Sequence, residues 1–205
     1  MTENARRDLY RILGGLLEQC PTPELLRVLA EADSLELLAQ HFGRELGDGL
    51  RAMRAGLAGG EEAREAIRRD YVALFVGPRK KLAPPWESVY RSPGRLVMQE
   101  PEREVVRAFA EQRVGFEGMG QKPADHIALE LQFVALLLER SAHKRAARAA
   151  LRRFLDQHIL QWVPAFAADV RKHAKTDLWR AAGQVLEAVC AMEAGPPSRP
   201  RLAVV

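Results

Sequence analysis

Cysteine is scarce in this chain, which has two cysteines in 205 residues. Cys20 and Cys190 lie near opposite ends and form no C-x-x-C pair. Both lie in apolar, helix-like contexts, and nothing in the chain indicates secretion. We therefore expect two buried, reduced thiols rather than a disulfide.

Long apolar runs are also missing, because no uninterrupted stretch approaches the ~20 residues that span a bilayer. The first ten residues are polar and charged, and no apolar run follows their arginines, so they do not form a secretory signal. The sequence therefore predicts a cytoplasmic protein without stable membrane insertion.

The common signatures of catalysis are absent as well. There is no phosphate-binding loop, dinucleotide fingerprint or nucleophile elbow. Zinc-protease H-E-x-x-H and di-iron Glu-x-x-His motifs are missing too. These absences favour a protein that is not an enzyme.

Net charge is +4, which is small for this length and does not by itself indicate nucleic acid. Basic residues nevertheless repeat every four positions along one predicted helix, at Arg140, Lys144, Arg148 and Arg152. Such a stripe is usually a solvated helix face, and an acidic partner, a phosphate or nucleic acid is the alternative. A second basic cluster, Arg79-Lys80-Lys81, lies on a predicted loop.

Apolar periodicity is helical along most of the chain, and β-branched residues nowhere alternate with polar ones. We predict an all-α globular domain of roughly eight to ten helices. Thr22-Pro23 is typical of a helix start. The glycines Gly43, Gly47 and Gly49 predict a turn between residues 43 and 50, and Gly59-Gly60 a second break.

Prolines and glycines divide the rest of the chain. Gly77-Pro78 ends a helix and opens a proline-rich aromatic loop at 78–94, in which Trp86 to Tyr90 can form one turn. Helix is predicted again at 101–114, then a flexible hinge near 115–122. We expect an N-terminal part (1–120), a C-terminal part (121–195) and a disordered tail (196–205).

In the C-terminal part Pro123 is predicted to open a helix, and a second long helix to run from 141 to 161. Pro164 then kinks the chain or starts a new helix, and Thr176 caps the last one.

Asp125 and His126 stand side by side near the first of these starts. Adjacent helical residues point about 100° apart, so the two do not face each other as a catalytic dyad would. His126 and Glu130 share a face, but no third ligand lies in the same element, and zinc needs three or four. An acid in the first helical turn is also favoured by the helix dipole alone.

An aromatic surface is the other candidate site. Trp86 and Tyr90 combine a large apolar body with a polar group, which suits partner binding, and Glu87 can receive a cation. The alternative is that Trp86 fills the core beneath the loop.

Three segments together resemble a known family. Leu74 to Pro78 followed by Pro84 to Tyr90 is similar to its first motif, and Pro123 to Ile127 with Glu130-Leu131 to its second. A weaker third element comprises Phe154-Leu155, His158 and Trp162. This combination resembles the TorD/DmsD/NarJ-type chaperones, which mature molybdenum-containing redox enzymes.

The resemblance implies an all-helical cytoplasmic chaperone without catalytic turnover. It would bind the twin-arginine leader of a molybdenum enzyme's catalytic subunit, or the apo subunit itself, before cofactor insertion and export. The peptide-binding residues carried over are Phe75, Pro85, Trp86, Glu87, Tyr90, Pro123, Asp125, His126 and Glu130. An apolar groove would take the leader's helix, and Glu87, Asp125 and Glu130 would pair with its arginines. We expect a monomer or a domain-swapped dimer without a cofactor.

Lys122 departs from the family, because many relatives carry an acid there. A lysine fits poorly beside two leader arginines. The alternatives are therefore a different leader, a different client, or binding to the mature enzyme. Weak guanine-nucleotide binding in an assembly factor, a small metal-dependent hydrolase at Asp125, His126 and Glu130, and a nucleic-acid-binding module remain the alternatives.

Overall fold

The computed structural model describes residues 2–77, 81–115, 123–141 and 144–195, and in these ranges the chain is helical without a β-strand. The helices are α1 (Glu3–Glu18), α2 (Pro23–Glu31), α3 (Ser34–Ala39), α4 (Arg44–Gly56), α5 (Glu61–Tyr71), α6 (Glu87–Arg91), α7 (Glu100–Glu111), α8 (Ile127–Ser141), α9 (Arg145–Phe154), α10 (Leu160–His173) and α11 (Asp177–Ala194). Two π-helical segments, η1 (Val72–Val76) and η2 (Leu155–Ile159), continue α5 and join α9 to α10. The all-α prediction is confirmed.

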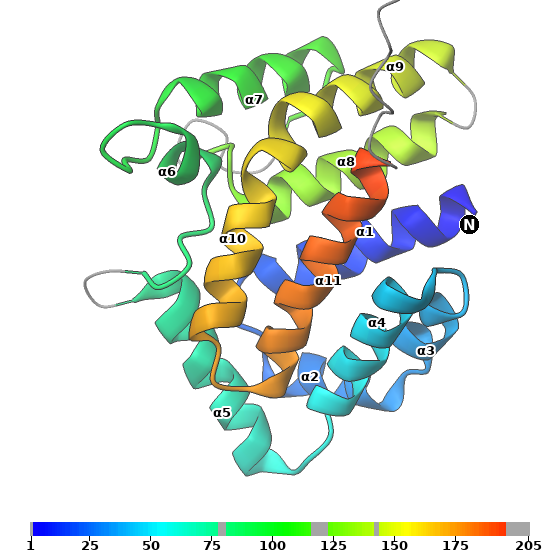
Figure 1. The fold of residues 1–205 in the computed structure, drawn as a ribbon, viewed down its shortest axis with the longest axis vertical. Helices are drawn as coiled ribbons and strands as arrows, with labels where there is room; N and C mark the ends of the chain where they lie inside the picture. The colour runs from blue at the N-terminus through cyan, green and yellow to red at the C-terminus, as the bar shows by residue number, and fades with distance from the viewer. Residues whose placement is uncertain (1, 78–80, 116–122, 142–143, 196–205) are drawn as a thin grey trace, which may run out of the picture.

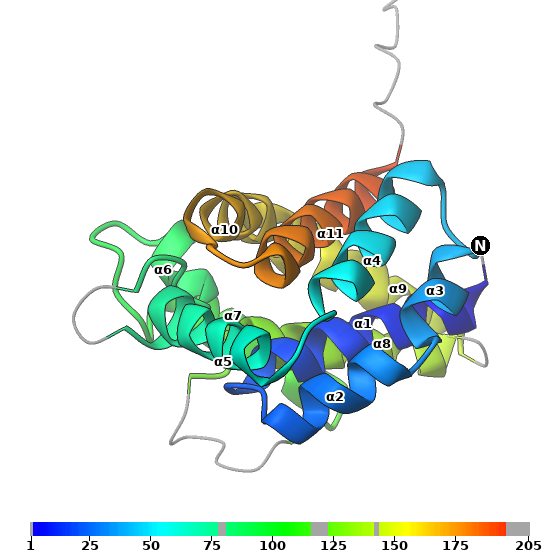
Figure 2. The ribbon, with the colours of Figure 1, turned by 90° about the horizontal axis from the view of Figure 1, so that it is seen from below.

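The helices pack in two layers. α11 lies between α10 and α4, and below them α1 packs against α8, with α2 beside it (Figures 1 and 2). Buried hydrophobic residues from Ala5 to Cys190 form one core. Chain segments on both sides of residue 120 contribute side chains to it. The division at residue 120 stays a prediction, and most of the expected hinge and the whole tail lie outside the described residues.

Local signals set several helix starts as expected. The hydroxyl of Thr22 accepts a hydrogen bond from the Leu25 amide at 3.1 Å, as an N-cap should. Thr176 also precedes α11, but its hydroxyl donates to Oδ2 of Asp70 on α5 at 2.8 Å. The same oxygen accepts from the amides of Lys175 and Thr176, so a buried carboxylate from α5 holds the two residues that precede α11.

The turn predicted between residues 43 and 50 is wrong, because residues 44–50 lie within α4 and Gly43 directly precedes it. Glycines within α4 serve packing instead. A Cβ on Gly49 would come within 2.9 Å of Cγ2 of Val185, and one on Gly56 within 2.5 Å of the backbone nitrogen of Leu178. Glycine therefore lets α4 approach α11 closely.

The helix boundaries after residue 120 differ from expectation. α8 begins at Ile127, not at Pro123, because the backbone around His126 pairs with the aromatic loop instead. The helix expected over 141–161 starts at Arg145, passes through η2 and continues as α10, which contains Pro164 in its interior. Pro164 therefore starts no new helix.

The basic stripe is not a single helix face. Arg140 lies in the last turn of α8 and donates to the Gln112 carbonyl at 2.8 Å, whereas Lys144 precedes α9. Arg148 donates to the Ser141 carbonyl at 3.3 Å, and Arg152 pairs with Asp156. These arginines bind helix ends and neighbouring side chains of their own chain.

The cysteines are both free thiols. Cys190 is buried in α11, where burial and the charges of Glu193 and Glu187 raise the pKa of its thiol to about 12. Cys20 departs from expectation, because it follows the end of α1 and is only half-buried. Among the described helices none has the length and apolarity to cross a membrane.

Candidate functional site

The aromatic loop and the segment before α8 lie side by side as two short antiparallel stretches of backbone. The amide of Glu87 donates to the Asp125 carbonyl at 3.0 Å, and the amide of Ile127 donates to the Pro85 carbonyl at 2.9 Å. Between these bonds, Trp86 and His126 form an isolated β-bridge. Two motifs that lie almost forty residues apart in sequence therefore form one structural unit.

Asp125 fixes this unit from inside. Its Oδ2 accepts a hydrogen bond from the Ser88 amide at 2.7 Å, so it caps α6 and does not lie in the first turn of α8, as the sequence had suggested. Burial raises the pKa of this carboxyl, and the charges of Glu87 and Glu102 act in the same direction. The Ser88 hydrogen bonds lower it in part.

Glu87 is the centre of a second buried contact. Its Oε2 lies 2.8 Å from Nδ1 of His158 in η2, and its Oε1 accepts a hydrogen bond from Arg91 one turn further along α6. Glu87 has no exposed surface, and these two partners supply a contact to each of its buried oxygens.

Glu130 completes the buried group. Its Oε2 accepts a hydrogen bond from the indole nitrogen of Trp162 in α10 at 3.0 Å. Burial and the nearby charge of Glu87 raise the pKa of Glu130 well above its usual range. Among the described atoms, Oε1 of Glu130 and Oδ1 of Asp125 have no hydrogen-bond partner.

These contacts bring all three motif segments together, and we call the group the motif joint. It joins α6, the start of α8, η2 and α10 through buried polar side chains: Glu87, Ser88, Asp125, Glu130, His158 and Trp162. No individual role is predicted from the sequence for His158, Trp162 or Arg91. The first two were visible only as the weaker third motif, and Arg91 gave no signal.

The surface above the joint is aromatic. The rings of Trp86 and His126 are both half-exposed and meet edge to face at 5.6 Å. Nζ of Lys81 lies 5.2 Å from the centre of the Trp86 ring, in a cation–π contact. Tyr90 is half-buried, and its hydroxyl donates to Asp169 at 3.0 Å.

The predicted site residues therefore divide into two groups. Trp86, Tyr90, Pro123 and His126 reach the surface, whereas Phe75, Pro85, Glu87, Asp125 and Glu130 are buried. The three acids were expected to pair with arginines of a bound peptide, but in the structure they face inward and contact their own chain. Peptide binding by the exposed group stays a prediction, and Lys122 lies outside the described residues.

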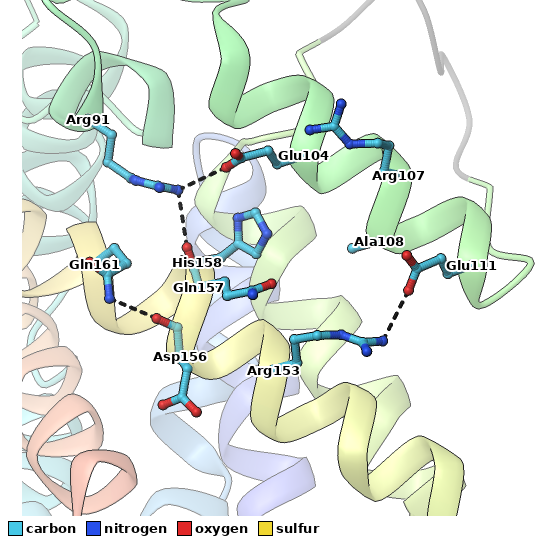
Figure 3. Close-up of a pocket in the computed structure, with 10 residues that line it drawn as sticks. All are labelled: Arg91, Glu104, Arg107, Ala108, Glu111, Arg153, Asp156, Gln157, His158 and Gln161. Atoms are coloured by element: carbon cyan, nitrogen blue, oxygen red, sulfur yellow. Dashed lines mark hydrogen bonds and ion pairs between the residues drawn. The ribbon is translucent and has the colours of Figure 1, made fainter.

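A charged cavity of about 600 Å³ adjoins the joint, between α7 and η2 (Figure 3). His158 lies at its wall, and Nη1 of Arg91 reaches across to Oε2 of Glu104 at 3.4 Å and to the Gln157 carbonyl at 3.1 Å. Further along α7, Glu111 accepts from Arg153 at 3.1 Å. The lining thus contains both carboxylates and guanidinium groups.

Metal binding finds no support here. Within the ranges that the structure describes, no group of three or more histidine, cysteine, aspartate or glutamate side chains could hold a metal ion. His126 directs Nδ1 toward the Ala128 amide at 3.2 Å, while Glu130 faces the core.

Comparisons with known proteins agree on one family. The family model described as nitrate reductase delta subunit matches residues 36–168. The chain is 30% identical over 115 residues to a probable Tat proofreading chaperone DmsD of Haemophilus influenzae, covering 56% of this chain and 54% of that protein. It is 29% identical over 140 residues to the chaperone protein TorD of Photobacterium profundum, covering 65% of each.

A chaperone protein TorD of Vibrio cholerae is 30% identical over 131 residues, covering 61% of this chain and 59% of that protein. The chain thus aligns with between half and two thirds of the length of these relatives. The region that the family model matches, residues 36–168, contains the motif joint and the aromatic surface above it.

Proposed function

Because this chain belongs to the nitrate reductase delta subunit family, with relatives named TorD and DmsD, we propose that it is a maturation chaperone for a molybdenum-containing oxidoreductase. It would bind the twin-arginine leader of the catalytic subunit, or the apo subunit, in the cytoplasm before cofactor insertion and export. In this proposal it acts by binding rather than by turnover, and it needs no cofactor of its own.

The observation that carries the proposal is the way in which the family's motif segments meet. Segments centred on residues 87, 125 and 158 form one buried joint, and that joint holds Trp86 and His126 at the surface. A rigid aromatic surface binds a flexible peptide with less loss of entropy than a mobile one would. The buried residues therefore support the binding surface without touching the peptide.

A basic leader fits this surface chemically. The Trp86 ring already holds one cation, the ammonium group of Lys81. A cation–π contact at an exposed site contributes only about 0.5–1 kcal/mol, so a basic side chain of the leader outside the twin-arginine pair can replace Lys81 at little cost.

The leader must later leave the chaperone. A disordered peptide loses conformational entropy when it becomes ordered, which keeps affinity moderate despite a large contact area. Moderate affinity suits a protein that holds its client until the cofactor is inserted and then releases it.

The experiment that tests the function is a pull-down from the native host with the tagged protein, followed by mass spectrometry. We expect enrichment of one molybdenum-enzyme catalytic subunit that still carries its leader. Recovery of a cofactor-binding subunit without a leader would indicate that the protein binds the mature enzyme. Recovery of nucleic acid, or of no specific protein, would contradict the chaperone function.

The aromatic surface is tested with Trp86→Ala, which should weaken binding of the recovered leader about tenfold in a folded protein. Phe42→Ala is a matched control, because Phe42 is another partly buried aromatic residue and lies outside this surface. Equal affinities of the two variants would remove Trp86 from the binding surface.

A further inference from the structure

The loop between α6 and α7 exposes three consecutive apolar side chains. Leu96, Val97 and Met98 are 60%, 40% and 50% exposed. Elsewhere in the described chain, large exposed hydrophobic residues are not consecutive. A run of exposed apolar residues is unfavourable in water unless a partner covers it, so this loop has the character of a binding surface.

The loop is held in place despite its exposure. The Gln99 amide donates to the hydroxyl of Ser88 at 3.3 Å, and the Gln99 side chain donates to the Val97 carbonyl at 2.9 Å. The guanidinium group of Arg95 lies 5.3 Å from the centre of the Tyr90 ring. These contacts tie the loop to α6 and hence to the motif joint.

Its backbone is also unusual. Arg95 and Met98 have left-handed φ angles of 54° and 57°, and Gly94 has a φ of 85°. Non-glycine residues adopt this conformation only where the surrounding contacts impose it, and they often do so at ligand-binding sites. The apolar side chains are thus presented in a preformed arrangement, which lowers the entropy lost on binding.

The neighbouring surface extends the apolar area. In both views the α6–α7 loop lies at the same end of the molecule as the end of η1 and the chain that leads into α6 (Figures 1 and 2). These two segments carry the exposed side chains of Val76 and Leu82 and the half-exposed ring of Trp86. The loop and the aromatic surface therefore flank α6.

The helix that follows this loop, α7, carries two carboxylates. Glu104 and Glu111 both line the cavity and are seven residues apart, which is about two helical turns or roughly 10 Å along one face. Their arginine partners, Arg91 and Arg153, contact them at 3.4 Å and 3.1 Å (Figure 3). The Arg153–Glu111 pair is solvent-exposed and worth about 0–1 kcal/mol, so an incoming arginine can replace Arg153 at little cost. Arg91 also contacts the buried Glu87 and can keep that contact when an incoming arginine takes Glu104.

We propose that the loop Leu96-Val97-Met98 docks the apolar stretch of a twin-arginine leader, while Glu104 and Glu111 receive its two arginines. The charge pattern selects this occupant, since an apolar surface next to exchangeable carboxylates complements a peptide with an apolar stretch and a basic end. The inference rests on the proposed function and names the surface that performs it.

The apolar half of the proposal is tested with the triple variant Leu96→Ser, Val97→Ser, Met98→Ser. Val28→Ser with Leu37→Ser is the matched control, because these residues are 51% and 57% exposed on α2 and α3. The probe is the leader of the subunit recovered by pull-down, as a fluorescein-labelled synthetic peptide in an anisotropy titration. We expect at least a tenfold weaker Kd for the triple variant and less than a twofold change for the control.

The charged half is tested with a thermodynamic cycle. Glu104→Gln with Glu111→Gln should weaken binding of the leader about tenfold, and should change little for a leader whose two arginines are replaced by glutamine. Glu61→Gln with Glu65→Gln, on α5, is the control for general charge effects. Equal losses with both peptides would overturn the assignment of the arginines to α7.

The outcomes separate the two proposals. If the wild-type protein binds the leader and the triple variant matches its control, the loop assignment is wrong while the chaperone function stands. If the wild-type protein binds no leader, or recovers only a subunit without one, leader binding fails and this docking surface fails with it.

Discussion

Oε2 of Glu87 in α6 lies 2.8 Å from Nδ1 of His158 in η2, and both side chains are buried. This contact joins the first and third motif segments across seventy-one residues of sequence. It indicates that the glutamate of the aromatic motif has a structural task inside the protein, although its neighbour Trp86 is at the surface.

We predict that His158→Ala destabilises the fold by about 3 kcal/mol, because it leaves one oxygen of a buried carboxylate without its partner. Urea denaturation followed by circular dichroism measures the change. A milder loss is expected for His158→Gln, whose amide can still donate to Glu87. A loss below about 1 kcal/mol for the alanine variant would show that the contact contributes little.

Asp125→Ala should lower the free energy of unfolding by about 1–3 kcal/mol, because it leaves the buried Ser88 amide without an acceptor and uncaps α6. Asp125→Asn retains a side-chain oxygen and should lose less. The prediction applies to stability, measured by denaturant titration. The variant should lower the affinity for the leader only if the loss of Asp125 displaces the residues of the aromatic surface. An alanine variant with wild-type stability and lost binding would instead place Asp125 in contact with the peptide.

Glu130 should make stability depend on pH. Its pKa is raised in the folded state, so between about pH 4.3, the usual carboxyl value, and the folded pKa the native state binds more protons than the unfolded state. Stability from this group is therefore present at low pH and is lost as pH rises through that window.

Glu130→Gln removes this dependence and keeps an oxygen for Trp162. The variant should gain stability relative to wild type as pH rises above about 4.3, as measured by urea midpoints at several pH values. A constant difference across that range would mean that Glu130 does not change its protonation on folding.

The glycines of the helical layers provide a packing test. Gly56→Ala should destabilise the protein by about 2 kcal/mol or more, because the new Cβ would lie 2.5 Å from the backbone of Leu178 and would push α4 from α11. Gly15→Ala is the control, since no neighbouring atom lies within 4 Å and the change should stabilise α1 by about 0.5–1 kcal/mol. Thermal melting distinguishes the two directions.

Some sequence expectations failed for a common physical reason. Gly47 and Gly49 indicate a turn when only neighbours in sequence are considered, but their lack of a side chain lets α4 pack against other helices. Likewise Pro123 signals a helix start, yet the next residues form hydrogen bonds with the loop around Trp86 instead. In both cases a contact with a distant segment overrides the local preference.

The sequence by itself determined the helical class and most breaks between helices, because apolar periodicity, caps such as Thr22 and pairs such as Gly59-Gly60 act on their immediate neighbours. It also determined which segments carry the family's motifs. Only the tertiary structure decided which motif residues face solvent. Burial of Glu87, Asp125 and Glu130 depends on partners thirty to seventy positions away. Local sequence patterns do not show which of these distant residues lie close together in space.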